Sequence, residues 1–174
     1  KATLTRFAQK CGYHGYKEFI YQYEETFVEK QEKITGNTRM VLNAYQELLN
    51  KTYSLVDESQ VVRITGYLNK AEKVIVCGRG SSGFSAKEME IRFMRIGVNV
   101  DSMTDSDMMR MSSVFQDKRC LVFGFSISGE TEEVTYLLEE SYKRGARTVL
   151  FTTNNRESFE NYCTEVVLLP SLKH

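Results

Sequence analysis

The most constraining feature of the sequence is a short apolar segment that ends in small polar residues. Cys120–Phe125 is almost entirely apolar and too short for a helix, so it predicts a buried strand of a parallel sheet. In residues 131–143, Val134, Leu137 and Leu138 recur at helical spacing between glutamates, which predicts an amphipathic helix. A buried strand followed at once by a helix favours an α/β fold.

The loop between this strand and this helix has the composition of an anion site. Ser126, Ser128 and Thr131 supply hydroxyl groups, and Gly129 permits a tight turn. These groups precede a helix N-terminus, where the helix dipole is positive and favours a phosphate. Ordinary helix capping is the alternative. A cap needs one hydroxyl, however, and this loop offers three, so we expect a phosphate site.

Further strands and helices are expected to alternate from residue 73 onward. The additional strands are expected at 73–77, 98–100, 148–151 and 166–169. In this region the additional helices are expected at 84–96, 108–115 and 157–162. Two more helices, at 38–53 and 57–69, are expected before the first strand. Such alternation predicts a parallel sheet with right-handed crossovers, which binds ligands at the carboxyl ends of its strands.

The loop after the first strand allows two interpretations. Residues 78–83 read G-x-G-x-x-G, and Asp101 lies near where a ribose-binding acid would be expected, which fits a nicotinamide-dependent dehydrogenase. Ser81 and Ser82, however, bring hydroxyl groups into this turn. The dinucleotide hypothesis also leaves the loop at 126–131 unexplained. Two serine-rich loops at neighbouring strand ends favour a single phosphate with a sugar attached.

The N-terminal segment is basic although the whole chain has a net charge of zero. Residues 1–17 contain lysines, an arginine and a histidine but no acid. A short helix is expected at 2–10, with Leu4, Phe7 and Ala8 facing inward, Gly12 ending it and a second helix beginning near Tyr16. This pattern is typical of the end of a helix-turn-helix. A basic, solvated helix explains it equally well.

Length and composition limit the classes of protein to which the chain can belong. The length fits one ordinary domain with a small appendage. No apolar run is long enough to cross a membrane. The four cysteines are far apart in sequence and read as reduced thiols of a cytoplasmic protein, and the two histidines form no zinc site. Because the chain begins with Lys1 rather than Met, we expect it to lack a native N-terminus.

Two segments together resemble a known family. Residues 76–169 resemble a sugar isomerase (SIS) domain, with its G-x-G-x-S loop at 78–82 and its S-x-S-G-x-T loop at 126–131. Residues 1–23 resemble the end of an RpiR-type helix-turn-helix, whose pattern A-T-x-x-R-F-x-x-x-x-G-(Y/F)-x-G-Y begins here at Ala2. The pair, in this order, resembles the RpiR family of bacterial transcriptional regulators.

The resemblance implies a fold and a set of site residues. The fold is a flavodoxin-like, five-stranded parallel sheet flanked by helices, preceded by an α-helical remnant of a helix-turn-helix. The remnant and linker would cover 1–36 and the SIS domain 37–174, with a helical lead-in over 37–72 and further helices expected beyond both ends. Phosphosugar-binding residues would be Gly80, Ser81, Ser82, Ser126, Ser128, Gly129 and Thr131. DNA-binding residues would be Lys1, Thr3, Thr5 and Arg6.

The resemblance also implies a function. The protein would be a cytoplasmic homodimer or higher homo-oligomer that binds a DNA operator, senses a phosphorylated sugar and controls sugar metabolism genes, without catalysis, cofactor or metal. The alternative is an aldose–ketose phosphosugar isomerase on the same fold, which needs a base beside the sugar. Glu130 is the only acid in the two loops, and it is equally well explained as a residue that stabilises the helix dipole.

Overall fold

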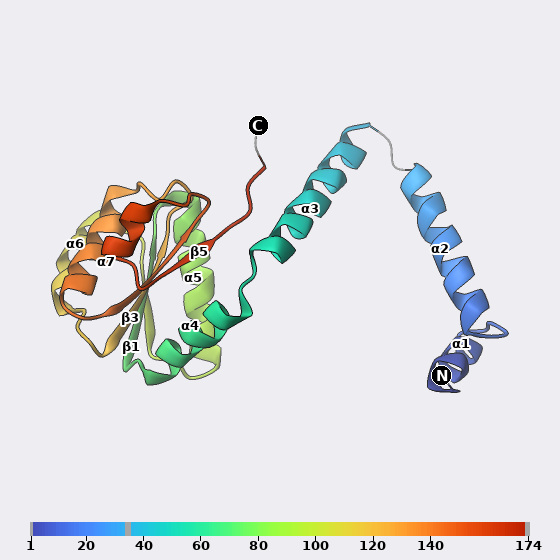
Figure 1. Ribbon diagram of the computed structural model, residues 1–174, viewed down its shortest axis with the longest axis horizontal. Coiled ribbons are helices and arrows are strands. Elements are labelled where there is room, and N and C mark those ends of the chain that lie inside the picture. The colour runs from blue at the N-terminus through green and yellow to red at the C-terminus, as the bar shows by residue number, and fades with distance from the viewer. Residues whose placement is uncertain (1, 34–35, 173–174) are drawn as a thin grey trace. The chain divides into compact units, whose positions relative to one another are not determined.

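The computed structural model describes residues 2–33 and 36–172 (Figure 1). Contacts within the chain divide it into two units, one up to Glu47 and the other from Leu48. Helix α3, Gly36–Leu55, passes from the first unit into the second. The predicted domain boundary between residues 36 and 37 stays a prediction.

Two helices joined by a glycine turn form the N-terminal part. Helix α1 is Ala2–Lys10 and helix α2 is Tyr16–Lys33, as the sequence predicted for their starts. Gly12 has a φ of +90°, a conformation that favours glycine. The Gly12 amide donates to the Gln9 carbonyl at 3.1 Å, so Gly12 ends α1 as expected.

An aromatic cluster joins these two helices. The Phe19 ring of α2 meets Phe7 of α1 edge-on, with ring centroids 5.6 Å apart. Ala8 is buried, as predicted, but Leu4 and Phe7 are 49% and 53% exposed. The expectation that all three face inward was therefore wrong for Leu4 and Phe7, because one partner helix covers only a narrow strip of α1.

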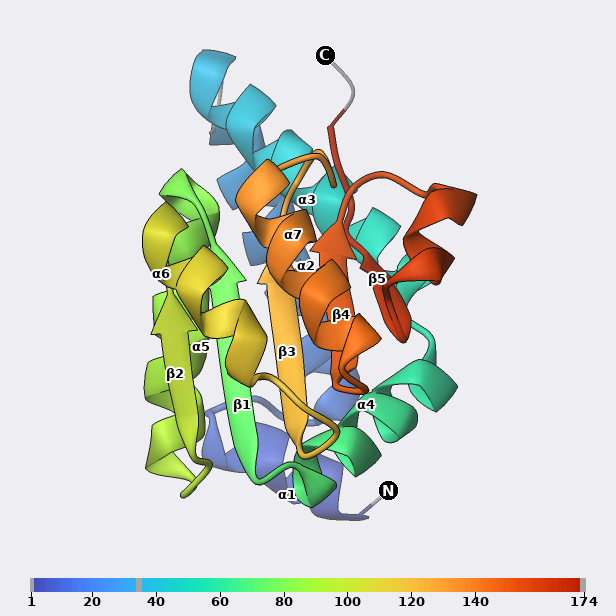
Figure 2. The same cartoon turned by 90° about the vertical axis from the view of Figure 1, so that its left-hand side faces the viewer.

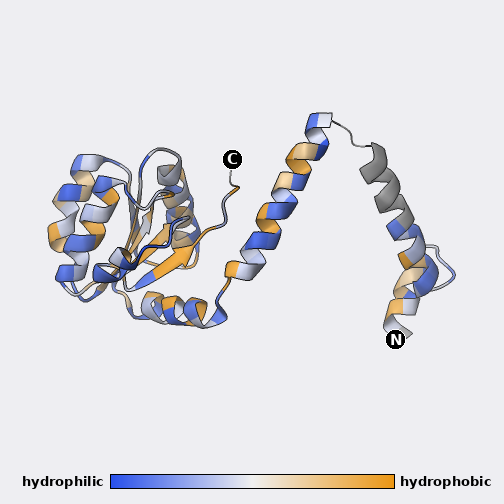
Figure 3. Ribbon diagram, turned by 45° about the horizontal axis from the view of Figure 1, so that its top comes forward, coloured by the Kyte–Doolittle hydropathy of each residue, from blue (hydrophilic) through white to orange (hydrophobic). Residues whose placement is uncertain are grey.

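Helix α3 carries hydrophobic residues interspersed with hydrophilic ones along its length and has no buried residue (Figure 3). Its exposed large apolar side chains are Met40, Val41, Leu42, Tyr45, Leu49, Tyr53 and Leu55. Among the described residues, no helix is long and apolar enough to cross a membrane.

Five parallel strands form one sheet, with the order β2-β1-β3-β4-β5 (Figure 2). The strands are β1 Lys73–Gly78, β2 Val100–Met103, β3 Cys120–Phe125, β4 Arg147–Thr152 and β5 Glu165–Leu168. The helices that follow α3 are α4 Glu58–Lys70, α5 Gly80–Arg95, α6 Ser106–Ser112 and α7 Glu132–Lys143, with short 3₁₀ helices at Ser113–Phe115 and Glu157–Asn161. The flavodoxin-like sheet inferred from the sequence is confirmed.

Each face of the sheet has its own core, because alternate strand residues point to opposite faces. On one face, Ile75 and Val122 pack with Leu137 and Leu138 of α7 and with Met109 of α6. The other face packs against α4 and α5. Its buried residues are Val74, Val76, Ala86, Val100, Leu121, Phe123 and Val149. The sequence left open whether the helices before the sheet pack on it, and α4 does.

Several elements differ from their predicted bounds, and helix α5 and strand β2 are two of them. Helix α5 begins at Gly80 rather than at Phe84, so the serines expected in a loop lie in its first turn. Strand β2 covers Val100–Met103 rather than 98–100, because its register is set by pairing with β1, from Val74 opposite Val100 to Cys77 opposite Met103.

Candidate functional site

The two serine-rich loops lie at the same edge of the sheet. Strands β1 and β3 are adjacent and parallel, and Gly78 at the end of β1 pairs with Phe125 at the end of β3. The chain leaves β1 toward β2 on one side and β3 toward β4 on the other, so the strand order reverses between the two loops. Such a switch point at the carboxyl ends is where open α/β sheets bind ligands.

Close backbone packing explains the glycines of the first loop. A Cβ on Gly78 would lie 2.5 Å from the Ser82 carbonyl oxygen, and one on Gly83 would lie 3.0 Å from the Gly78 oxygen. Gly80 has a φ of +54°. The loop therefore folds tightly onto the end of β1, which brings the N-terminus of α5 to the carboxyl edge of the sheet.

The first loop also contains two serine hydroxyl groups, those of Ser81 and Ser82. Ser81 is exposed and Ser82 is half-buried in the first turn of α5. Neither hydroxyl has a hydrogen-bond partner within the described part of the chain. The neighbouring Arg79 is held by the Thr104 carbonyl, at 3.3 Å from its guanidinium, and by Glu133, at 3.9 Å. Sequence reasoning did not single out Arg79.

Two hydroxyls of the second loop bind each other. Ser126 is only 1% exposed, and its Oγ lies 2.9 Å from Thr131 Oγ1. The Thr131 amide donates to Ser126 Oγ at 3.3 Å. Either hydroxyl can be the donor of this contact, and when Ser126 donates, the half-buried Thr131 hydroxyl is free to donate outward. The Ser126 hydroxyl thus contacts Thr131 rather than solvent.

The remaining groups of the second loop face outward. Ser128 is exposed, and its Oγ accepts the Glu130 amide at 3.2 Å. The amides of Ile127 and Ser128 have no acceptor among the residues that the structure describes. Two unpaired consecutive amides, with the hydroxyls of Ser128 and Thr131, form a group of donors suited to an anion.

Gly129 is required by its surroundings. It has a φ of +71°, and a Cβ there would lie 2.5 Å from Phe159 Cζ and 3.2 Å from Thr152 Oγ1. No other residue type fits this position without displacing both neighbours. The loop is thus pressed against the end of β4 and the 3₁₀ helix that follows.

The carboxylates of Glu130 and Glu133 lie near the two loops, and each has a partner within the protein. Glu130 forms an ion pair with Arg156, with an oxygen–nitrogen distance of 2.6 Å. Glu133, which the sequence analysis did not count because it lies in the first turn of α7, accepts the Ser106 hydroxyl at 3.1 Å. Hydrogen bonds from its own amide and from Ser106 lower the pKa of Glu133. A general base for proton abstraction needs the opposite shift, toward neutral pH.

Asp101 is badly placed to bind a ribose. It pairs with Ile75 near the amino end of β2, whereas the glycine loop follows the carboxyl end of β1. Its carboxylate binds the Lys73 ammonium at 2.6 Å. The acid that the dinucleotide hypothesis needs is therefore turned to the wrong end of the sheet.

The expected DNA-binding residues are on α1. Thr3 and Arg6 are exposed, and Thr5 is half-buried. Lys1 lies outside the described residues. None of these positions is tested by a bound partner, and their role stays a prediction, as does that of the phosphosugar-binding residues. Within the described ranges, no three His, Cys, Asp or Glu side chains are grouped so that they could hold a metal ion.

Residues at the end of β4 complete the second loop and were not predicted. Thr152 and Thr153 donate to the Ile127 carbonyl, and Asn154 Nδ2 donates to the Ser128 carbonyl at 2.7 Å. The available signal was the polar cluster directly after a buried strand that neighbours β3.

Curated relatives resemble the chain over almost its whole length. A transcriptional regulator of the helix-turn-helix (HTH) type from Haemophilus influenzae is 25% identical and covers 97% of this chain and 63% of its own. An HTH-type transcriptional regulator from Clostridium perfringens is 28% identical and covers 89% of this chain and 60% of its own. The chain thus spans less than two thirds of the length of these relatives.

Solved structures share the fold. Vibrio vulnificus NanR, in complex with ManNAc-6P, superposes with a TM-score of 0.74 at 24% identity and covers 98% of this chain and 63% of its own. The sugar isomerase domain of an RpiR transcription factor from Sphaerobacter thermophilus has a TM-score of 0.69 at 17% identity, covering 75% of each chain. A Methanococcus jannaschii protein with an inferred 3-hexulose-6-phosphate isomerase function has a TM-score of 0.64 at 18% identity, covering 78% of this chain and 75% of its own.

A protein-family model also matches the part of the chain that forms the sheet. The model described as the SIS domain matches residues 67–174, which include the whole sheet and both loops. With its strand order, its switch-point loops and this match, the chain belongs to the SIS domain family.

Proposed function

We propose that this protein is part of a bacterial transcriptional regulator whose SIS domain senses a phosphorylated sugar. The phosphate would bind the donors of the second loop and the first turn of α5, and the sugar would extend outward. Ligand binding would change the affinity of the basic N-terminal helices for an operator through two arrangements of a cytoplasmic homodimer.

One observation carries this proposal: the second loop presents donors and no unpaired acid. The unpartnered amides of Ile127 and Ser128 belong to the same loop as the Thr131 hydroxyl, and this loop follows β3, whose neighbour β1 leads into the first turn of α5 with its unpaired hydroxyls. A dianion gains from several such donors at once, and hydrogen bonds to charged groups are the strong ones. The regulator names of the curated relatives and the ManNAc-6P complex of NanR support the same proposal.

The operator-binding half of the proposal depends on α1 and α3. Arg6 is exposed on a helix that carries no acid in its first turn and ends in Lys10. The apolar, exposed face of α3 offers a surface for a second copy of the chain. Both features suit a dimer that sets two basic helices on two half-sites of a duplex.

The Ser128→Ala variant tests the phosphate site. We expect its affinity for a bound sugar phosphate to fall about tenfold to a hundredfold, because one hydrogen bond to a dianion is lost. Wild type and variant are screened by thermal shift against a panel of hexose and pentose phosphates, with the matching free sugars as blanks. The shift at a fixed ligand concentration should shrink or vanish in the variant.

Ser54→Ala is the matched control, since Ser54 is also exposed and also makes one local hydrogen bond, to the Lys51 carbonyl at 2.7 Å. It should keep the full ligand shift. A Ser128→Ala protein that melts earlier but retains its ligand shift would show that Ser128 is only a local cap and would contradict the proposed site.

The geometry disfavours an isomerase. Glu130 is ion-paired with Arg156 and Glu133 has a lowered pKa, so neither acid is poised to take a proton from a sugar carbon. We expect no exchange of the proton next to the carbonyl when sugar phosphates are incubated with the protein in heavy water and followed by proton NMR. Exchange above the buffer blank that disappears in Glu130→Gln or Glu133→Gln would favour the enzyme instead.

A further inference from the structure

Residues at the end of β4 and directly after it donate hydrogen bonds to two backbone carbonyls of the second loop. The Ile127 carbonyl accepts three hydrogen bonds: from the Thr153 amide at 3.1 Å, from Thr153 Oγ1 at 2.9 Å and from Thr152 Oγ1 at 3.1 Å. A carbonyl oxygen has two lone pairs, so these three donors saturate it.

The neighbouring carbonyls are occupied too. The Ser128 carbonyl accepts Asn154 Nδ2 at 2.7 Å, and the Ser126 carbonyl accepts the Gly129 amide at 3.0 Å. The donors are tied to one another, because the Asn154 amide donates to Thr152 Oγ1 at 3.2 Å. Three consecutive carbonyls therefore have partners, while the amides of Ile127 and Ser128 between them have none among the described residues.

This asymmetry gives the loop its charge preference. Each peptide group carries a partial negative charge on oxygen and a partial positive charge on its amide hydrogen. When the oxygens of residues 126–128 are bound, the unpaired backbone groups left on Ile127 and Ser128 are their amide hydrogens, which attract an anion. A carbonyl released from β4 would be free to turn toward the ligand and repel it.

We propose that Thr152, Thr153 and Asn154 are positioning residues for the anion site, an inference that rests on the proposed function. They bind the carbonyls of Ile127 and Ser128, so that the unpaired backbone groups of these two residues are amide donors for a dianion such as a phosphate monoester. They act through the loop backbone and need no contact with the ligand. The preference of the loop for an anion would thus depend on residues at the end of β4 and directly after it.

Thr153 and Asn154 are the positions to change. Thr152 is fully buried and its side chain lies next to Gly129. Replacing it would therefore also alter the packing around the loop. Thr153 and Asn154 are only half-buried. Thr153→Val removes the hydroxyl at nearly constant volume, and Asn154→Ala removes the donor to the Ser128 carbonyl.

The test is a titration of the whole ¹⁵N-labelled chain with inorganic phosphate, followed by the NMR shifts of the Ile127 and Ser128 amides. We expect Asn154→Ala to weaken phosphate binding about tenfold, because it leaves the Ser128 carbonyl without its donor. Thr153→Val should weaken binding less, because the Thr153 amide and Thr152 Oγ1 still bind the Ile127 carbonyl, and Thr153→Ser should bind phosphate as wild type does. Thr148→Val is the control, because Thr148 Oγ1 donates to the Tyr162 carbonyl at 2.8 Å at the opposite end of β4. It should destabilise the sheet without weakening phosphate binding.

The outcomes separate the two proposals. If no amide of the 126–131 loop in the wild-type protein responds to phosphate, the proposed function fails and this inference with it. If the wild-type protein responds and both variants bind phosphate as tightly as the wild-type protein does, the positioning role is overturned while the proposed function stands. A Thr148→Val protein that loses binding as much as Asn154→Ala would also overturn the positioning role, since the effect would then come from a general destabilisation of β4.

Discussion

At the scale of single residues, the second loop depends on one glycine. Gly129 combines a left-handed backbone with contact to Phe159 and Thr152. We expect Gly129→Ala to destabilise the fold by roughly 2–4 kcal/mol, about 1–2 from the left-handed conformation and the remainder from overpacking. Denaturant unfolding of the two proteins measures the difference.

Gly97→Ala separates these two causes. Gly97 has a φ of +82°, but a Cβ there would meet nothing within 4 Å. Its replacement should cost only the backbone share, about 1–2 kcal/mol. Equal losses at the two positions would mean that the contact between Gly129 and Phe159 has no energetic consequence.

Sequence reasoning predicted the types of residue in the site better than their directions. The hydroxyls at 126, 128 and 131 were expected to converge on a ligand, but Ser126 is buried and serves Thr131. The direction of a side chain depends on packing between distant segments, which a motif does not encode. For the same reason the hydrogen bonds from Thr153 and Asn154 to the loop were not foreseen.

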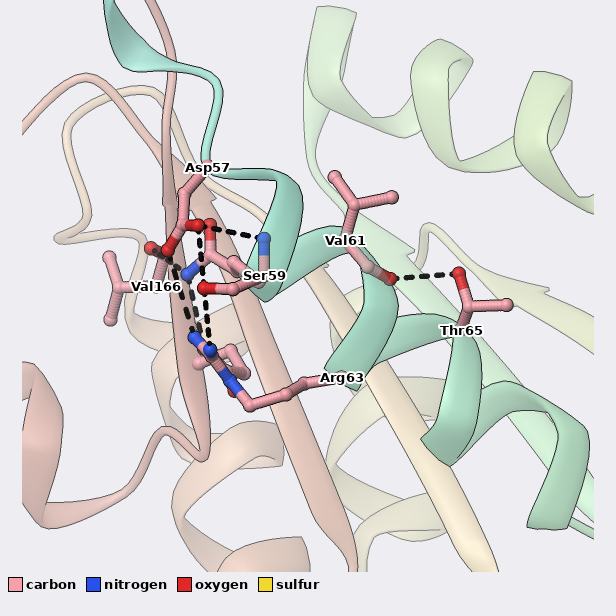
Figure 4. A network of polar contacts seen from close by, with 8 residues as sticks. Asp57, Ser59, Val61, Arg63, Thr65 and Val166 are labelled. Atoms are coloured by element: carbon pink, nitrogen blue, oxygen red, sulfur yellow. Dashed lines mark hydrogen bonds and ion pairs between the residues drawn. The ribbon is translucent and has the colours of Figure 1, made fainter.

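At the scale of elements, a polar network joins α4 to β5 (Figure 4). Asp57 caps α4 by accepting the Ser59 amide at 2.8 Å. Arg63 donates to Glu165 through Nε at 2.6 Å and through its terminal nitrogen at 3.0 Å, and Gln60 Nε2 donates to the Val166 carbonyl at 3.0 Å. The helix before the sheet is thereby fixed to the sheet's last strand.

This network predicts a pH dependence. The Arg63 hydrogen bond lowers the pKa of Glu165 below its usual 4.5, so the stabilisation is present above about pH 4.5 and is lost as pH falls through the lowered value. We expect Glu165→Gln to lower Tm by about 2–4 °C at pH 7. The difference from wild type should disappear at acid pH, as melting curves across pH would show.

Glu88→Gln provides the comparison for that prediction. Glu88 pairs with Arg92 one turn away on α5, and both side chains are well exposed. Such pairs contribute little, so this variant should melt like wild type at every pH. A Glu165→Gln protein that shows the same flat behaviour would remove the ion pair from the stability of the α4–β5 contact.

Element types followed from the sequence more closely than element ends. The apolar runs of β1, β3 and β4 predicted buried strands because both faces of the sheet are covered. Strand β2 was misplaced because it is an edge strand whose Asp101 and Ser102 are polar. The Ser102 amide and hydroxyl both donate to Glu90 of α5, at 2.8 Å each, a tertiary contact that no local pattern indicates.

At the scale of the whole molecule, the cysteines distinguish the two units. Cys11 is exposed in the first unit, whereas Cys77, Cys120 and Cys163 are buried in the second. Burial raises the pKa of Cys77 and of Cys163 to about 12. The buried thiols are therefore protonated at neutral pH and shielded from reagents.

Thiol labelling at mildly alkaline pH should detect one fast cysteine in the native protein and all four after unfolding. Because burial raises their pKa to about 12, we expect Cys77 and Cys163 to react far more slowly than the exposed Cys11. Cys11→Ser should abolish the fast phase. If the fast phase persists in that variant, a buried thiol must be reached by opening of the sheet.

The dependence of the second loop on β4 also sets an order of events during folding. The hydrogen bonds between Ile127 and residues 152–153 join positions 25 and 26 apart in the chain. Contacts of such separation form only after the intervening segment has closed into a loop. Strand β3 and helix α7 are neighbours in sequence, but the turn between them takes its final shape only once β4 has docked. In refolding, the proposed phosphate site should therefore form together with β4, after the helix that begins at the loop has formed.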